Sequence, residues 1–158
     1  MKKTNVARFL DNLKIEYRLM EYEVDESDVS AEAVAKKTNL PLEQVFKTLV
    51  ARGDKSGVLL ACIPGGGQLD LKRLSEISGN KKIEMVPVKE IQALTGYIRG
   101  GVSPIGTKKH YPVYLDESAL KFSFIAISAG VRGCQILLDP KHLFKAVGAQ
   151  TSPISRSD

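Results

Sequence analysis

The spacing of hydrophobic and polar residues predicts a series of short helices. Apolar residues recur at helical intervals after Thr4, Ser30 and Asp70. Each of these residues carries a side-chain oxygen of the kind that favours a helix N-cap. Asn39 and Gly79 suit the left-handed conformation that ends a helix. We therefore expect helical segments over 4–13, 30–39, 41–44, 70–79, 88–94 and 140–147.

Segments with apolar residues at alternate positions, or in short runs, predict strands between these helices. Residues 45–52 and 58–63 flank the turn sequence Gly53-Asp54-Lys55-Ser56-Gly57, so we expect them to pair as a hairpin. Further strands are expected over 15–22, 82–85, 113–116, 123–128 and 134–138.

Helices and strands are mixed along the chain without repeats or a linker, which predicts one α+β domain with a mixed, strongly curved sheet. We assign residues 1–150 to this domain. The small and polar residues at 151–158 predict a loose tail.

Composition places the chain among globular proteins. Of its 158 residues, 43% are hydrophobic and 26% are charged. No apolar run approaches the roughly 20 residues that cross a bilayer, and Asp11 and Asn12 interrupt the N-terminal segment before a signal peptide forms. Cys62 and Cys134 do not make a disulfide framework. We expect a cytoplasmic protein that does not bind a membrane.

The net charge of +5 leaves two interpretations open. Basic residues occur as neighbours at Lys2-Lys3, Lys36-Lys37, Lys72-Arg73, Lys81-Lys82 and Lys108-Lys109. These pairs belong either to an ordinary solvated surface or to a diffuse positive face that attracts the phosphates of a polyanion.

Several common chemistries do not fit the sequence. Residues 101–108 place Thr before Lys, the reverse of a phosphate-binding P-loop. The run 65–67 lacks the third glycine of a dinucleotide fingerprint. His110 and His142 have no spacing that would join the cysteines in a metal site, and no Ser or Cys nucleophile motif accompanies them. We expect no metal and no cofactor.

The loop over 97–109 is the strongest candidate for chemistry. Gly100 and Gly101 allow positive φ and a close approach of a ligand to main-chain N–H groups. Pro104 restricts its own φ and disfavours the α region for Ser103, which gives the loop a defined shape. Such a loop is suited to holding a carbonyl or a phosphate oxygen.

Lys47 is the second candidate, because it interrupts an apolar strand. In an extended strand it shares a face with Val45, Leu49 and Ala51. Its ammonium either reaches solvent at the strand end or lies at the mouth of a pocket, facing a phosphate or a developing oxyanion.

Four segments of the chain resemble, in content and order, those of the YbaK family. They are Val-Phe-Lys-Thr-Leu around Lys47, Gln-Leu-Asp at 68–70, Gly-Gly-Val-Ser-Pro-Ile-Gly at 100–106 and Ser-Ala-Gly-Val-Arg-Gly at 128–133. These freestanding aminoacyl-tRNA deacylases are related to the editing insertion of bacterial prolyl-tRNA synthetase. The resemblance covers roughly residues 4–147 and is greatest to the branch that clears cysteine from proline tRNA.

The resemblance implies a curved, barrel-like mixed sheet surrounded by helices, with a pocket for the aminoacylated 3′ end of tRNA. It implies catalytic roles for Lys47, Gly100 and Gly101. It also implies substrate contacts from Tyr22, Ser30, Thr48, Val102, Ser103, Pro104, Ser128, Gly130 and Arg132. Two positions depart from the family pattern and bear on amino-acid preference: Ser30 stands where a phenylalanine can occur, and Gln135 where an aspartate can occur.

The implied reaction deacylates Cys-tRNA(Pro), and Cys-tRNA(Cys) as a further substrate, through the thiol of the substrate itself. Two alternatives stay open: a deacylase for Ala- or Ser-tRNA that uses a bound water, and a non-catalytic tRNA- or synthetase-binding module. The implied partners are aminoacylated tRNA, with acceptor-stem phosphates on the basic surface, and prolyl-tRNA synthetase.

Overall fold

Three of the α-helices begin at the capping residues that the sequence predicts. In this computed structural model, which describes residues 3–157, Thr4, Ser30 and Asp70 accept hydrogen bonds from main-chain N–H groups at 3.2, 3.2 and 3.1 Å. Asn39 and Gly79 end two helices in the left-handed conformation. The α-helices are α1 Asn5–Asn12, α2 Ala31–Thr38, α3 Leu71–Ser78, α4 Val88–Thr95 and α5 His142–Val147, and the 3-10 helices are η1 Leu42–Gln44 and η2 Glu117–Lys121.

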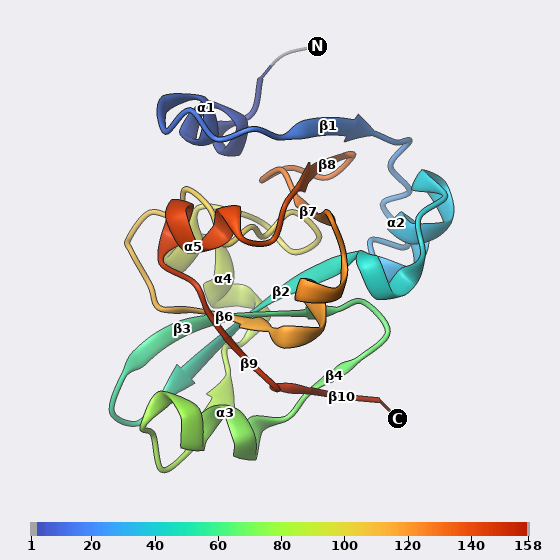
Figure 1. Ribbon diagram of the computed structural model, residues 1–158. Helices are drawn as coiled ribbons and strands as arrows, with labels where there is room; N and C mark the ends of the chain where they lie inside the picture. The colour runs from blue at the N-terminus through green and yellow to red at the C-terminus, as the bar shows by residue number, and fades with distance from the viewer. Residues whose placement is uncertain (1–2, 158) are drawn as a thin grey trace.

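A five-stranded mixed sheet in the order β5-β2-β3-β6-β9 forms the centre of the fold (Figure 1). The predicted hairpin is confirmed, because β2 and β3 pair antiparallel from Phe46 opposite Pro64 to Gly53 opposite Gly57. β6 and β9 then add in parallel. The strands are β2 Phe46–Gly53, β3 Gly57–Pro64, β5 Ile83–Met85, β6 Val113–Asp116 and β9 Gln150–Ser152.

Two smaller sheets complete the strands. β1 Arg18–Glu21, β8 Cys134–Leu138 and β7 Ile125–Ser128 form an antiparallel sheet in that order. A parallel bridge between Val45 and Ala126 joins this sheet to the segment that precedes β2. β4 Gln68–Leu69 pairs with β10 Ser155–Arg156.

The α+β class and the single domain are confirmed, whereas no closed barrel forms within residues 3–157. Closure would require pairing along both edges of the central sheet. Instead β5 and β9 form its two edges, and the other strands belong to separate sheets.

The strand expected over 15–22 is shorter in the structure and covers only Arg18–Glu21. The main-chain N–H of Ile15 donates to the carbonyl of Leu10 at 3.0 Å, so the chain is still completing the end of α1 at this point.

The β2–β3 hairpin has apolar packing on both faces. Phe46 and Val50 belong to the large core, to which β7 and β8 also contribute side chains. Ala51 belongs to a second core with Leu74 of α3, and Leu49 packs against it. Consecutive side chains of β2 therefore enter different environments, which is the alternation expected of a strand.

The prediction of a loose tail over 151–158 is wrong for the residues that the structure describes. β9 and β10 lie in this part of the chain, and Ile154 between them is fully buried. A carboxylate oxygen of Asp116 accepts hydrogen bonds from the N–H groups of Ile154 and Ser155 at 3.0 and 2.9 Å. The partner of this small, polar segment is distant in sequence, so local composition does not reveal the pairing.

None of the helices within residues 3–157 combines the length and apolarity that a bilayer crossing requires.

Candidate active site

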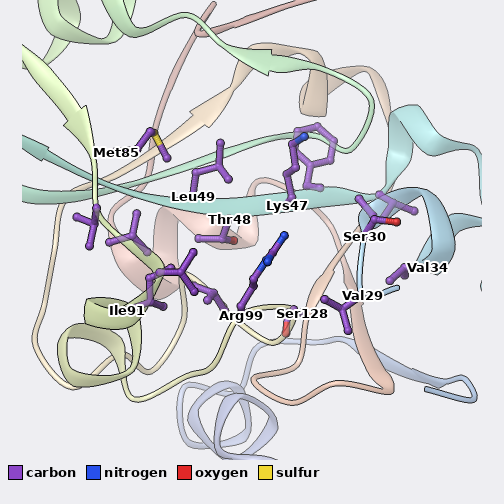
Figure 2. A pocket seen from close by; sticks show the side chains of 18 of the residues that line it. Val29, Ser30, Val34, Lys47, Thr48, Leu49, Met85, Ile91, Arg99 and Ser128 are labelled. Atoms are coloured by element: carbon purple, nitrogen blue, oxygen red, sulfur yellow. The ribbon is translucent and has the colours of Figure 1, made fainter. Parts of the chain in front are cut away.

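A cavity of about 410 Å³ lies beside the first half of β2 (Figure 2). Strand β5 pairs with residues 51–53 of β2, and the N–H of Val86 donates to the carbonyl of Val50 at 3.0 Å. The edge of β2 over 46–49 is left open and borders this cavity. Residues from four further parts of the chain line it: α2 with the segment before it, the β5–α4 region, the glycine loop, and the ends of β7 and β8. They include Val29, Ser30, Val34, Met85, Val88, Ile91, Arg99, Gly100, Val102, Ser128 and Gln135.

Lys47 and Thr48 both line the cavity but leave β2 on opposite faces (Figure 2). The ammonium of Lys47 donates a hydrogen bond to the carbonyl of Gly65 at 3.1 Å. An ammonium has three donors, so two remain for other partners. The hydroxyl of Thr48 lies 3.6 Å from the sulfur of Cys62.

The glycine loop presents Gly100 and Val102 to the cavity. Gly100 has φ +87°, and a Cβ atom there would lie 2.9 Å from Cβ of Val29, so only glycine fits. The N–H of Gly101 donates to the carbonyl of Ile98 at 2.8 Å and is therefore occupied. Within residues 3–157, the N–H groups of Gly100 and Val102 have no hydrogen-bond partner.

Ser103 and Pro104 are buried and do not line the cavity. The hydroxyl of Ser103 accepts a hydrogen bond from the N–H of Ile105 at 3.3 Å. The phenol of Tyr97 donates to the carbonyl of Ile105 at 2.7 Å, and burial raises the pKa of this phenol. These residues therefore hold the loop in shape from behind and do not contact the contents of the cavity.

Ser128 lines the cavity, whereas Gly130 does not. The hydroxyl oxygen of Ser128 accepts a hydrogen bond from the N–H of Gly130 at 3.0 Å, and its own O–H donor stays available. Gly130 has φ +94°, and a Cβ atom there would lie 2.9 Å from the ring of Tyr97. Gly130 therefore shapes the turn that carries Ser128.

Arg132 and Tyr22 lie outside the cavity, beside the segment between β1 and α2. The Nε of Arg132 donates to the carbonyl of Arg99 at 2.9 Å, and its Nη1 forms an ion pair with Glu26. Arg132 thus ties the glycine loop to the β1–α2 segment.

Ser30 lines the cavity, but its hydroxyl is committed to local structure. It accepts from the N–H of Ala33 as the cap of α2 and donates to a carboxylate oxygen of Asp28 at 2.7 Å. The small side chain therefore leaves space in the cavity without offering it a free hydroxyl.

Arg99 and Gln135 also line the cavity. Arg99 was not among the candidate site residues, and Gln135 was named only as a departure from the family pattern that bears on amino-acid preference. The side chain of Arg99 points into it, towards β2 (Figure 2). Gln135 is only 4% exposed, yet no hydrogen bond of its side-chain amide occurs within residues 3–157. A polar residue inside the apolar strand 134–138, and a cation directly before the glycine pair, were the signals available in the sequence.

Cys62 is fully buried, and burial raises the pKa of its thiol to about 12. At neutral pH the group is therefore a neutral thiol, and Cys62 behaves as a small buried hydrophobic residue. Within the described part of the chain, no three His, Cys, Asp or Glu side chains gather as a metal site would require.

The residues that line the cavity thus carry the N–H groups of Gly100 and Val102, the hydroxyl of Ser128, the amide of Gln135 and the guanidinium of Arg99. These are donors that suit a carbonyl oxygen, an oxyanion or a phosphate. The arrangement is suited to binding an ester with a nearby anionic group.

Comparisons with known proteins agree with this chemistry. Residues 25–146 match the family model described as "Aminoacyl-tRNA editing domain". The chain is 45% identical over 157 residues to an Enterococcus faecalis protein named as the Cys-tRNA(Pro)/Cys-tRNA(Cys) deacylase EbsC, covering 99% of this chain and 96% of that one. It is also 31% identical over 102 residues to the proline–tRNA ligase of Burkholderia multivorans, which is 62% of this chain and 18% of the ligase.

A solved structure described as a trans-editing enzyme for prolyl-tRNA synthetase superposes with a TM-score of 0.86 at 27% identity, over 97% of this chain and 96% of that one. The sequence match spans more than half of the chain, and the fold match nearly all of it. The chain belongs to the aminoacyl-tRNA editing domain family.

Proposed function

We propose that this protein is a trans-acting editing enzyme that removes cysteine from Cys-tRNA(Pro), and from Cys-tRNA(Cys) as a further substrate. The observation that carries the proposal is the 45% identity to EbsC over nearly the full length of both chains. The cavity supports it, because its main-chain donors and small volume suit the end of an aminoacylated tRNA.

The substrate thiol serves as the nucleophile in this proposal. The thiol loses its proton as its sulfur bonds to the ester carbonyl, the bond from that carbon to the ribose oxygen breaks, and the ribose oxygen takes up a proton. The enzyme then needs to hold the reactive conformer and stabilise the oxyanion. The neutral thiol of Cys62 and the occupied hydroxyl of Ser30 fit a site in which the protein supplies no nucleophile.

The oxyanion is stabilised by main-chain N–H groups of the glycine loop. Gly100 and Val102 have unpaired N–H groups within residues 3–157 and line the cavity, so they are the donors we assign. The N–H of Gly101 is occupied by Ile98, so Gly101 contributes the turn itself. Lys47 adds positive charge from the open edge of β2.

The partner is aminoacylated tRNA, with its 3′ end in the cavity and its acceptor-stem phosphates on the basic surface. The match to part of a proline–tRNA ligase supports a link to prolyl-tRNA synthetase, which would supply the mischarged tRNA. We also place the protein in the cytoplasm, where this substrate is formed.

The test is to offer cysteinyl-, seryl- and alanyl-tRNA and to follow the loss of each amino acid. We expect cleavage of the cysteinyl ester, with little loss of serine or alanine. Equal cleavage of the seryl or alanyl ester would point to a bound water as the nucleophile. Salt-dependent tRNA binding without any cleavage would point to a binding module.

A further inference from the structure

Arg99 is a cavity-lining cation whose charged group has no hydrogen-bond or ion-pair partner within residues 3–157. The ammonium of Lys47 already donates to Gly65, and the guanidinium of Arg132 is shared between Glu26 and the carbonyl of Arg99. Within residues 3–157 the guanidinium of Arg99 has neither a hydrogen bond nor an ion pair. Its side chain points into the cavity, towards β2 (Figure 2).

The main chain that carries Arg99 is held on both sides. Its carbonyl accepts the hydrogen bond from Nε of Arg132 at 2.9 Å, and the next turn is closed by the bond from Gly101 to Ile98 at 2.8 Å. The ion pair with Glu26 fixes Arg132 in turn. The exposed side chain of Arg99 therefore extends from a defined main-chain position.

Arg99 also lies between the two ends of the cavity (Figure 2). Met85 and Ile91 lie at one end and Ser30 and Val34 at the other, with Arg99 between them (Figure 2). The Met85 end is open to solvent and apolar, since Met85 is 43% exposed, and it suits a planar base. A nucleotide whose base lies there brings its phosphate within the range of a central guanidinium.

We propose that Arg99 binds the 5′-phosphate of the terminal nucleotide of the acceptor end, the phosphodiester that joins it to the rest of the tRNA. This inference rests on the proposed function and names the substrate group that the cation recognises. A guanidinium presents paired donors that match two phosphate oxygens, and it stays charged at all physiological pH values. The ester oxyanion is left to the main-chain donors of Gly100 and Val102 and to the charge of Lys47.

The experiment compares two small substrates that differ only in this phosphate, 2′(3′)-O-cysteinyl-AMP and 2′(3′)-O-cysteinyl-adenosine. We expect Arg99→Ala to lower kcat/KM for the AMP ester about 10- to 100-fold, the range of a charge-assisted hydrogen bond, and to leave the adenosine ester unchanged. Arg99→Lys keeps the positive charge but loses the paired donors of the guanidinium. Its kcat/KM for the AMP ester should therefore lie between those of wild type and Arg99→Ala. An equal loss on both esters would overturn the proposal, because it would place Arg99 at the reacting carbonyl.

Lys55→Ala is the matched control, because Lys55 lies in the turn at the other end of the hairpin from Lys47. This variant should cleave both esters at the wild-type rate.

Binding of unesterified AMP and adenosine gives a readout without turnover. Wild type should bind AMP more tightly than adenosine, and Arg99→Ala should lose that preference. Wild type that fails to cleave cysteinyl-tRNA but still prefers AMP would contradict the deacylase function alone, whereas equal binding of AMP and adenosine would contradict the role of Arg99.

Discussion

Lys47 and Thr48 are consecutive residues of β2 whose side chains leave the strand on opposite faces (Figure 2). Both reach the same cavity because the edge of β2 is open there. The sequence predicted a costly cation on an apolar face. The structure shows that the carbonyl of Gly65 offsets part of this cost by accepting one hydrogen bond from the ammonium.

Replacement of Lys47 tests whether its charge serves the reaction. We expect Lys47→Ala to lower kcat/KM for cysteinyl-tRNA on the order of 10²-fold, because it removes a positive charge next to the developing oxyanion. Thermal unfolding should change little, since only one side-chain hydrogen bond to Gly65 is lost. A folded variant with an unchanged rate would end this assignment.

Gly100 carries two constraints that can be separated. Its φ of +87° strains any other residue by about 1–2 kcal/mol, and a Cβ atom would also meet Val29 at 2.9 Å. We therefore expect Gly100→Ala to displace the β1–α2 segment and to reduce deacylation at least 10-fold, measured as kcat/KM.

Gly57→Ala is the matched control for backbone strain. Gly57 has φ +74°, but a Cβ atom there has no heavy atom within 4 Å. The Gly57→Ala variant should lose about as much stability from backbone strain as Gly100→Ala does, while keeping full activity. Partial recovery in the double variant Gly100→Ala with Val29→Ala would locate the damage at this contact, and equal activity loss in both glycine variants would contradict it.

At the scale of elements, the β2–β3 hairpin is positioned by groups outside the hairpin. Oδ1 of Asn80 accepts from the N–H groups of Lys55 and Ser56, both at 2.9 Å. Asp54 accepts from the N–H groups of Lys81 and Lys82 at 2.9 and 3.1 Å. The turn is therefore joined to the connection between α3 and β5, and the hairpin and β5 form one unit.

The hydrogen bonds from Lys82 and Lys81 hold the pKa of Asp54 below its ordinary value of 3.8. A carboxylate with a lowered pKa stabilises the fold above the unfolded-state pKa, and this contribution is lost as pH falls through the lower folded-state pKa. We expect Asp54→Asn to unfold at lower denaturant concentration than wild type at pH 7. The difference should shrink below about pH 3.8, so a difference that stays constant across pH would contradict this role of the charge.

At the scale of the whole molecule, the C-terminal residues 150–156 pair with two different sheets. β9 pairs with β6, β10 pairs with β4, and the fully buried Ile154 between them belongs to the second core. Asp116 anchors this segment through the N–H groups of Ile154 and Ser155. The last strands therefore connect two parts of the chain that are far apart in sequence.

Truncation of the Ile154 side chain measures how much the packing of this C-terminal segment contributes to the stability of the fold. Ile154→Ala should lower the free energy of unfolding by about 2–5 kcal/mol, the cost of a cavity at a fully buried isoleucine. Ile98→Ala is the comparison, because Ile98 is 44% exposed and should cost far less. Equal and small losses in the two variants, measured by denaturant unfolding, would mean that the C-terminal segment is loosely attached.

Local chemistry determined the elements that the sequence predicted correctly. Side-chain oxygens at Thr4, Ser30 and Asp70 each satisfy an orphan N–H group at the start of a helix, so these three starts are predictable without tertiary contacts. The hairpin is also predictable from local sequence, because its turn and its two strands are adjacent in the chain.

The lining of the cavity shows which site residues could be predicted from the sequence and which could not. The sequence and its family resemblance singled out Lys47, Thr48, Gly100, Val102, Ser30 and Ser128, and the structure brings these residues together around one space. They also singled out Gly101, Ser103, Pro104, Gly130, Arg132 and Tyr22, which do not line it. A motif identifies a loop, but the direction of each side chain depends on what packs behind the loop.

The helix caps, the hairpin and a shaped glycine loop could be predicted from the amino-acid sequence, because these features depend on neighbours within a few residues. Tertiary contacts were needed to show that Arg99 faces the cavity with a guanidinium unpaired within residues 3–157, that Arg132 and Glu26 hold its main chain, and that the C-terminal segment pairs with β4 and β6. These features depend on contacts between segments far apart in the chain, and the free energy of such contacts comes from packing and pairing that no local pattern records.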